Sequence, residues 1–157
     1  MSEVSHRAAC KPARGGVPNV LFGRLSLEEA PGDLIGLADR LTVLFPWGSL
    51  LRAVAAPNTA LRKLAALGKP GGRVHFLYGY GSEESTALGL PELGCGDVLH
   101  NLESAYAAAG LQVEARYAAR EFVASVESTW AKKLAFSRRA RAFIEIRGTI
   151  QAGPGWW

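Results

Sequence analysis

The sequence predicts a single α/β domain that spans residues 1–157. Its 157 residues are 48% hydrophobic and 20% charged and include 18 glycines, a composition typical of a globular protein. Short apolar runs alternate with segments that carry helix-capping residues. This alternation favours largely parallel strands joined by crossover helices.

Five segments have the pattern of β-strands. The continuous apolar runs at 19–25 and 41–46 are typical of buried, parallel strands. Residues 73–80, 112–118 and 143–150 complete the set. In the last two, apolar and polar residues alternate, as a strand with one buried face requires.

Three helices are predicted from their capping residues. Ser49 caps a helix that follows the strand at 41–46. Asn58 caps a second helix that ends at Gly68, and Asn101 caps a third that ends at Gly110.

Positive charge is concentrated at the two ends of the chain. Residues 1–24 carry a net charge of +3, residues 25–129 carry −4, and residues 130–157 carry +5. Two basic segments suit a polyanionic partner, because neutralising phosphates and releasing counterions provides most nonspecific affinity for nucleic acid. The alternative is a solvated basic surface without a partner.

Composition also disfavours several classes of protein. No uninterrupted apolar run of about 18 residues is present, and residues 1–15 lack an apolar core, so neither a membrane span nor a secretory signal is predicted. We therefore expect a cytoplasmic protein. Cys10 and Cys95 form no CxxC motif, and only three histidines accompany them, so no metal site is predicted and both thiols are expected to be reduced.

The first motif of functional interest is LTVLFPWGSLL at 41–51. A strand ends there at Phe45-Pro46, and Trp47 follows directly. Ligands of open α/β sheets bind outside the carboxyl ends of the strands, so Trp47 is placed where a substrate ring would lie. The alternative is that Trp47 covers the hydrophobic core.

The second motif is ESTWAKKLAFSRRARAF at 127–143, in which Trp130 is followed by five basic side chains. An aromatic ring beside basic groups can stack a base and hold its phosphates. The alternative is an ordinary apolar helical stripe, because Phe122, Val126, Trp130 and Leu134 are spaced four residues apart.

The two motifs, in this order, resemble one enzyme family. The chain is similar to the 16S rRNA (adenine-1408, N1) methyltransferases of the KamB/NpmA type, which confer aminoglycoside resistance. The resemblance runs from Met1 to about Gly148, and the stretches that carry it are KPARGGVPNVLF at 11–22, Glu28, LTVLFPWGSLL at 41–51 and STWAKKLAFSRRAR at 128–141.

This resemblance implies a Rossmann-like class I SAM-dependent methyltransferase sheet, with S-adenosyl-L-methionine (SAM) as cofactor. It also implies 16S rRNA within the 30S subunit as partner, no membrane association and a monomeric enzyme. Trp47 and Trp130 match the residues that stack on opposite faces of a flipped adenine, and Ser128 matches a substrate-holding position. The remaining matches are Glu28, Phe45 and Pro46 at the cofactor, and Lys11, Arg14, Lys132, Lys133, Arg138, Arg139 and Arg141 at the RNA.

The resemblance also leads us to expect an incomplete sheet. Family members begin with a strand, a DxGxG-type turn and a second strand, together about 50–60 residues, and these have no counterpart here. Gly79-Tyr80-Gly81 is no substitute, because a lone GxG after a strand is more often a turn. In the family's strand order, 3-2-1-4-5-7-6, the strand at 41–46 would then keep an unpaired edge, and SAM would bind weakly or not at all.

The chemistry implied by the family needs no general base. N1 of adenine carries a lone pair in the ring plane and can attack a sulfonium methyl group directly. Extruding the base costs a few kcal/mol, and stacking on each indole offsets about 1–3 kcal/mol of that cost. Catalysis would then consist mainly of positioning donor and acceptor.

Two other functions remain open. One is a noncatalytic ribosome-binding remnant, which would keep the basic ends and both tryptophans without binding SAM. The other is a methyltransferase for a small molecule, which would not need basic clusters at both ends of the chain.

Overall fold

The computed structural model describes residues 27–56, 59–94, 96–137 and 141–152. The chain divides into two units, Met1–Ala30 and Pro31–Trp157. Of the first unit only a short 3-10 helix, η2 (Leu27–Glu29), is described. The second unit begins with another 3-10 helix, η3 (Gly32–Leu34), and contains all the strands described below. The predicted strand at 19–25 lies outside the described residues.

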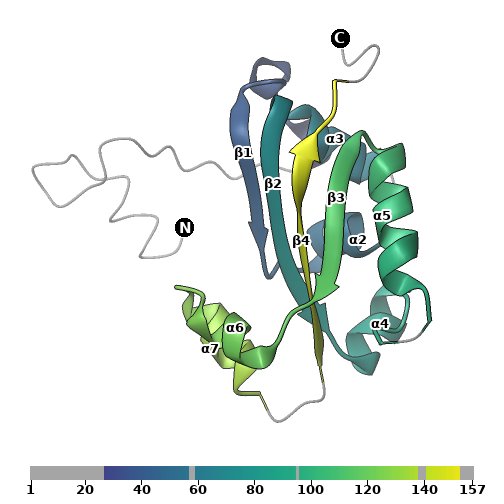
Figure 1. The fold of residues 1–157 in the computed structure, drawn as a ribbon, viewed down its shortest axis with the longest axis vertical. Coiled ribbons are helices and arrows are strands. Elements are labelled where there is room, and N and C mark those ends of the chain that lie inside the picture. The colour runs from purple at the N-terminus through teal and green to yellow at the C-terminus, as the bar shows by residue number, and fades with distance from the viewer. Residues whose placement is uncertain (1–26, 57–58, 95, 138–140, 153–157) are drawn as a thin grey trace, which may run out of the picture. The chain divides into compact units, whose positions relative to one another are not determined.

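Within the described residues, four strands form one mixed sheet in the order β1-β2-β4-β3 (Figure 1). The strands are β1 (Ala38–Leu44), β2 (Gly68–Tyr80), β3 (Leu111–Tyr117) and β4 (Ala142–Ile150). β1 and β2 are parallel, whereas β4 is antiparallel to both β2 and β3. This order reproduces the 4-5-7-6 half of the strand order expected from the resemblance.

The expectation of largely parallel pairing is wrong for β4. The segment between β3 and β4 leaves and re-enters the sheet at the same end, because Tyr117 pairs with Ile144 near the start of β4. A connection that returns at the same end makes neighbouring strands antiparallel and needs no crossover.

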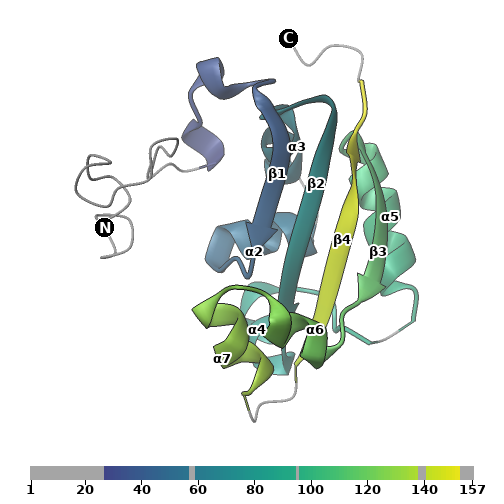
Figure 2. The same cartoon turned by 60° about the vertical axis from the view of Figure 1, so that its left-hand side comes forward.

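Helices cover the two faces of the sheet unequally (Figures 1 and 2). One face carries the buried side chains of Phe76, Ile144 and Ile146, and Tyr106 of α5 lies with its ring centroid 6.0 Å from that of Phe76. On this side lie α2 (Gly48–Ala55), α3 (Thr59–Ala66), α4 (Ser82–Leu88) and α5 (Val98–Ala108).

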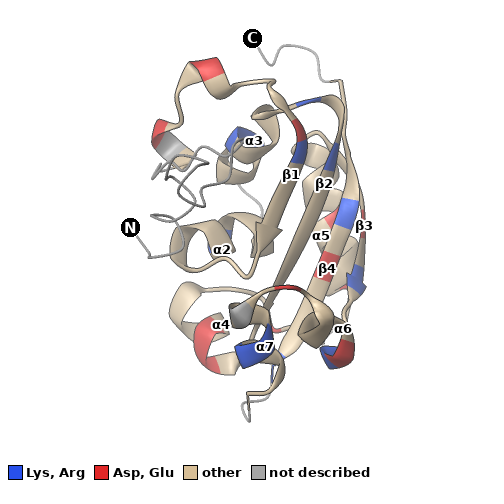
Figure 3. Cartoon of the chain, turned by 90° about the vertical axis from the view of Figure 1, so that its left-hand side faces the viewer, with Lys and Arg blue, Asp and Glu red and all other residues tan. Residues whose placement is uncertain are grey.

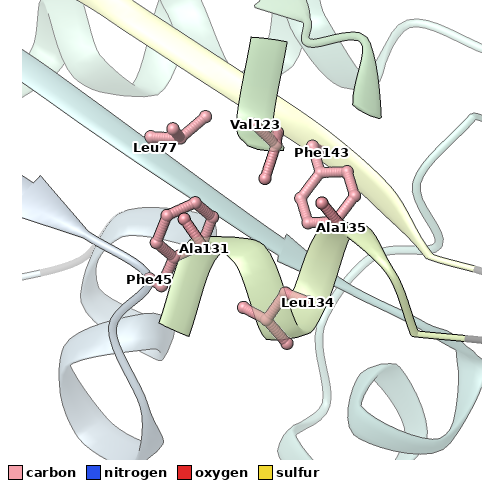
Figure 4. Packing of buried hydrophobic residues seen from close by; sticks show 7 residues of the cluster. All are labelled: Phe45, Leu77, Val123, Ala131, Leu134, Ala135 and Phe143. Carbon is pink, nitrogen blue, oxygen red and sulfur yellow. The ribbon is translucent and has the colours of Figure 1, made fainter. Parts of the chain in front are cut away.

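Among the described residues, the opposite face is covered only at the carboxyl ends of β1 and β2, by α6 (Arg120–Ser125) and α7 (Thr129–Ala135) (Figure 2). Their contact with the sheet forms a hydrophobic cluster, shown in Figure 4. Its buried members are Phe45, Leu77, Val123, Ala131, Leu134, Ala135 and Phe143.

Several predicted helix boundaries are corrected by the structure. α5 begins at Val98 with Asp97 as its N-terminal flanking residue, so Asn101 lies inside the helix. Trp47, not Ser49, precedes α2. The helix predicted to end at Gly68 is α3, which ends at Ala66, and Gly68 begins β2; Asn58 lies outside the described residues. Helix α4 was not predicted, because no strong capping side chain precedes it.

A buried carboxylate ties β2, β3 and β4 together. Glu145 of β4 is 1% exposed and accepts hydrogen bonds from Arg116 Nε at 2.8 Å, Arg147 Nε at 2.7 Å and His75 Nε2 at 2.9 Å. Burial by itself raises the pKa of Glu145, but the hydrogen bonds from Arg116, Arg147 and His75 outweigh it, so the pKa is held below its ordinary value.

This lowered pKa predicts a pH-dependent contribution to stability. A carboxyl whose pKa is lower in the folded state binds fewer protons there than in the unfolded chain. The stabilisation is therefore complete above the ordinary pKa of 4.5 and is lost as the pH falls through the lowered value. We expect Glu145→Gln to have a lower free energy of unfolding than the wild type at neutral pH. This difference should become smaller as the pH falls through the lowered pKa of Glu145. Urea unfolding across this pH range measures it, and a difference that stays constant would contradict the electrostatic explanation.

Candidate active site

Two tryptophans from distant parts of the sequence meet at the carboxyl ends of β1 and β2. Trp47 directly precedes α2, and Trp130 belongs to α7. Their ring centroids are 6.0 Å apart, with the ring planes inclined at 50°. Trp47 is 57% exposed and Trp130 is 41% exposed. Neither ring is therefore a core side chain, and the alternative that places Trp130 in a buried apolar stripe is wrong.

The turn after β1 directs Trp47 outward. Phe45 is 5% exposed, and its ring packs edge-on against Phe143 with centroids 6.5 Å apart. Its backbone N–H donates to Leu77 O at 2.7 Å. With its φ angle at 49°, Phe45 has a left-handed backbone conformation that is strained for a bulky residue. Such strain persists where the surrounding structure enforces it, and it is concentrated at functional sites.

Helix α7 places Trp130 opposite this turn. Ser128 caps the helix, since its Oγ accepts a hydrogen bond from the backbone N–H of Ala131 at 3.3 Å. Ala131 and Leu134 face the hydrophobic cluster, which leaves Trp130 on the solvent side. Lys133 Nζ lies 5.9 Å from the centroid of the Trp130 ring, within the range of a cation–π interaction.

The predicted stripe of Phe122, Val126, Trp130 and Leu134 is wrong. The chain there forms two short helices, α6 and α7, instead of one continuous helix. The break at Val126 and Ser128 changes the helical phase, so Leu134 is buried whereas Trp130 is not.

Arg141 directly precedes β4 and lines the same hollow as Trp47. Its side chain is 8% exposed, its Nη1 donates to Gly79 O at 2.9 Å, and its Nη2 pairs with Glu84. Within the described part of the chain, its buried Nε has no hydrogen-bond partner. Burial raises the pKa of Glu84, but the hydrogen bonds from the Gly81 N–H and Arg141 more than offset it and hold the pKa below the ordinary value.

Glu84 is a site residue that the sequence analysis missed. The signal was present, since an acidic residue three positions after Gly81 is the arrangement of a helix N-terminus whose third residue reaches back to the preceding backbone N–H.

Arg141 links two hollows of the surface. One adjoins the tryptophans and is lined by residues that include Phe45, Pro46, Trp47, Gly79 and Glu84. The other is lined by residues that include Tyr80, Ser82, Ser85, Glu92 and Leu93. The first hollow combines an apolar wall, an aromatic rim and one paired cation, but its volume of about 20 Å³ is too small to hold a ring in the observed conformation.

The other predicted site residues are distributed as follows. Lys132 and Lys133 are exposed on α7, and Pro46 is partly exposed beside Trp47. Lys11, Arg14, Arg138, Arg139 and the side chain of Glu28 lie outside the described residues. Among the residues that the structure describes, no three His, Cys, Asp or Glu side chains are grouped to hold a metal ion, and no helix is long and apolar enough to span a membrane.

Comparison with known proteins identifies the family. The family model described as NpmA, 16S rRNA (adenine(1408)-N(1))-methyltransferase, matches residues 1–149. The chain belongs to this family. It is 36% identical over 155 residues to the 16S rRNA (adenine(1408)-N(1))-methyltransferase of Streptoalloteichus hindustanus, covering 96% of this chain and 71% of the relative.

Solved structures of the family share the fold. The crystal structure of the 16S rRNA methyltransferase KamB superposes with a TM-score of 0.74 at 33% identity, covering 97% of this chain and 72% of KamB. A variant of the Catenulisporales acidiphilia enzyme with its cosubstrate SAM gives a TM-score of 0.70 at 28% identity, covering 97% of this chain and 70% of the other. The family, the α/β methyltransferase fold and SAM as the family's methyl donor are thus confirmed.

Ser128 caps helix α7, and this structural role can be tested separately from any contact of Ser128 with the substrate. Ser128→Ala should lower the free energy of unfolding by about 1 kcal/mol, because the N-terminus of α7 loses its side-chain acceptor. Ser128→Thr should restore most of that stability. Ser49→Ala, an exposed serine in the first turn of α2, is the control and should change stability by less than about 0.5 kcal/mol. Urea unfolding measures all three, and an unchanged midpoint for Ser128→Ala would show that the cap does not stabilise the fold.

Proposed function

We propose that this chain transfers a methyl group from SAM to N1 of adenine 1408 in 16S rRNA, within the 30S subunit, and that this modification gives aminoglycoside resistance. The observation that carries the proposal is the pair of exposed indoles, Trp47 and Trp130, held together at the carboxyl end of the sheet. We propose a monomeric cytoplasmic enzyme.

The indole pair must open to accept a base. A ring between two parallel indoles needs about 3.5 Å on each side, or about 7 Å between the indole centroids. The observed 6.0 Å and 50° leave no room for it. Trp130 is carried by a helix of seven residues, α7, whereas Trp47 follows the strained and buried Phe45. We infer that α7 moves and that the β1 turn stays fixed when adenine enters.

The residues present fit the methyl donor at the same turn. Phe45 and Pro46 form a fixed, mostly apolar wall in the hollow beside Trp47, and the enforced strain at Phe45 marks a backbone shaped for a ligand. We propose that these two residues form part of the SAM site and that Glu28 is a further cofactor-binding residue. SAM supplies an electrophilic methyl group bonded to a positively charged sulfur.

The chain's own residues then act by position. N1 of adenine is nucleophilic without losing a proton, so the site needs no base, and the carboxylate of Glu84 is already paired with Arg141. The indole faces of Trp47 and Trp130 favour the positive charge that develops on the adenine ring. Orientation of the two reactants accounts for the remaining rate enhancement.

We propose that basic side chains bind phosphates of the RNA around this site. Lys132 and Lys133 are exposed beside Trp130, and we propose that they bind phosphates together with Lys11, Arg14, Arg138 and Arg139. Arg141 differs because its side chain is buried. We propose that it reaches a phosphate only through its unpartnered Nε or after leaving Glu84.

A noncatalytic RNA-binding protein is the second candidate. One observation favours it: the outer edge of β1 has no strand partner among the described residues. The described part of the sheet would therefore contact the methyl donor from one side only.

The two candidates differ in donor affinity. We predict a dissociation constant for SAM of about 1 mM or weaker, because the described part of the sheet contacts the donor from one side only. Isothermal calorimetry measures it, and methyl transfer to purified 30S subunits is assayed at millimolar SAM. Salt-dependent binding to the subunits without any methyl transfer would favour the noncatalytic candidate. Micromolar affinity would contradict the prediction of a one-sided donor site.

Substituting the tryptophans tests the stacking role directly. Trp47→Ala and Trp130→Ala should each reduce methyl transfer about 5- to 150-fold, corresponding to about 1–3 kcal/mol per stacked face. Thermal stability should change little, because both side chains are exposed. Phe substitutions should retain partial activity, since a smaller aromatic face remains.

Phe136→Ala is the matched control. Phe136 follows α7, is 78% exposed and is assigned no role. It should leave methyl transfer unchanged. Strong destabilisation of the two Ala variants would instead show that the indoles have a structural role.

A further inference from the structure

The sheet face on the α6–α7 side carries an unusual number of arginines. Arg40 of β1, Arg73 of β2, Arg147 of β4 and Arg116 of β3 all lie on this face, and all are exposed. We call these four residues the arginine face. Figure 3 shows Lys and Arg positions on the strands and on α7 in one view.

The register places all four on the same side as α7. Arg40 pairs with Arg73, and Arg73 with Thr149, so these residues share one face of the pleat. Along β2, Arg73 and Leu77 differ by an even number of positions and point to the same side, and Leu77 contacts the cluster formed by α6 and α7. Arg116 pairs with Glu145, which is itself the partner of Leu77.

Two of these arginines are held in place by Glu145. The carboxylate accepts from Nε and Nη2 of Arg116 at 2.8 and 2.5 Å, and from Nε and Nη2 of Arg147 at 2.7 and 2.6 Å. Glu145 is 1% exposed, whereas the side chains of Arg116 and Arg147 are 57% and 58% exposed. Each guanidinium is thus oriented from below and keeps N–H groups that solvent can reach. A fixed guanidinium binds a phosphate with little further loss of rotamer freedom.

The other two arginines lack a counter-charge. Arg40 and Arg73 are register partners on neighbouring strands, so two like charges lie side by side. No ion pair to either is found within the part of the chain that the structure describes. Like charges at this spacing repel, and an anionic ligand would remove the repulsion.

The net charge of the arginine face indicates which kind of ligand it binds. With Glu145 and Glu114 as the acidic side chains on this face, the four arginines leave a net charge of +2. The segment 1–24 of the same chain carries +3, so its charge opposes binding to this face. Lys132 and Lys133 on α7 extend the positive charge toward the tryptophans. From Arg73 to Leu77, where the α6–α7 cluster begins, β2 spans about 13 Å, a length over which a nucleic-acid duplex presents several phosphates.

We propose that the arginine face binds the phosphodiester backbone of the 16S rRNA as a second contact, separate from the adenine site. This inference rests on the proposed function. The face contributes affinity that depends on salt and not on base sequence, because guanidiniums that meet only phosphates carry no sequence information.

The test uses the full chain and purified 30S subunits. The double variant Arg40→Gln/Arg73→Gln removes two charges whose side chains are exposed and outside the Glu145 network. The control is Arg52→Gln/Arg62→Gln, which removes two exposed charges from α2 and α3 on the opposite side of the sheet. A third variant, Arg40→Lys/Arg73→Lys, keeps the charge. Fluorescence anisotropy of labelled protein measures the dissociation constant as a function of salt.

For the Gln variant we expect the slope of log affinity against log salt to fall by about 1.4–1.8. Between about 50 and about 200 mM salt this corresponds to about tenfold less loss of affinity than in the wild type. The Lys variant should retain most of the wild-type slope, and the control variant all of it. Urea unfolding confirms that the variants are folded.

Three outcomes would overturn the inference. A Gln variant with the wild-type slope would show that the arginine face does not meet phosphate. Weaker binding by the Gln variant with an unchanged salt slope would show that the arginine face contacts a protein surface of the subunit instead of phosphate. Wild-type chain that neither binds subunits nor transfers methyl groups would remove the proposed function and this inference with it. In the first two cases methyl transfer and its dependence on Trp47 and Trp130 would remain, so the two failures are distinguishable.

Discussion

The packing of α7 on the buried ends of β1, β2 and β4 is the contact on which the candidate active site depends. Ala131, Leu134 and Ala135 fit against Phe45, Leu77 and Phe143 (Figure 4). Small residues let the helix approach the sheet closely, and the aromatic rings fill the remaining space. Because this face of α7 is buried, Trp130 must point outward, toward the turn that presents Trp47. A single apolar contact thus positions both indoles.

Strain and buried charge surround this contact. Phe45 adopts a left-handed backbone conformation, and Arg141 and Glu84 form an ion pair in the hollow beside Trp47. Each feature costs free energy that the neighbouring packing and hydrogen bonds must offset. Their concentration at one end of the sheet fits a site that works by positioning, in line with our proposal that α7 moves to admit a base while the β1 turn stays fixed.

The charged side chains of the protein differ in what they pair with. Glu145 lies inside the sheet, yet it holds two arginines whose outer N–H groups remain exposed. We propose that the basic ends, the two lysines of α7 and the arginine face all contact phosphates. A large substrate such as a ribosomal subunit can use all of them, whereas a small molecule cannot, and the small-molecule alternative has no feature of the structure in its favour.

The sequence by itself determined the family, the α/β class and four of the strands. The apolar runs at 41–46, 73–80, 112–118 and 143–150 each overlap an observed strand, because strand hydrophobicity is a local pattern. It also singled out Trp47 and Trp130, since each follows an unusual local motif. Helix starts were less accurate: α5 begins before Asn101, because side-chain capping competes with tertiary contacts that the local sequence does not show.

Tertiary structure decided which residues meet. The spacing of Phe122, Val126, Trp130 and Leu134 is compatible with one apolar stripe, and only the break before Ser128 separates Trp130 from it. The pairing of Glu84 with Arg141 and of Glu145 with Arg116 joins residues far apart in the chain, and no local pattern specifies such pairs. The arginine face likewise exists only in the folded sheet, since strand register is what brings four separate arginines to one side.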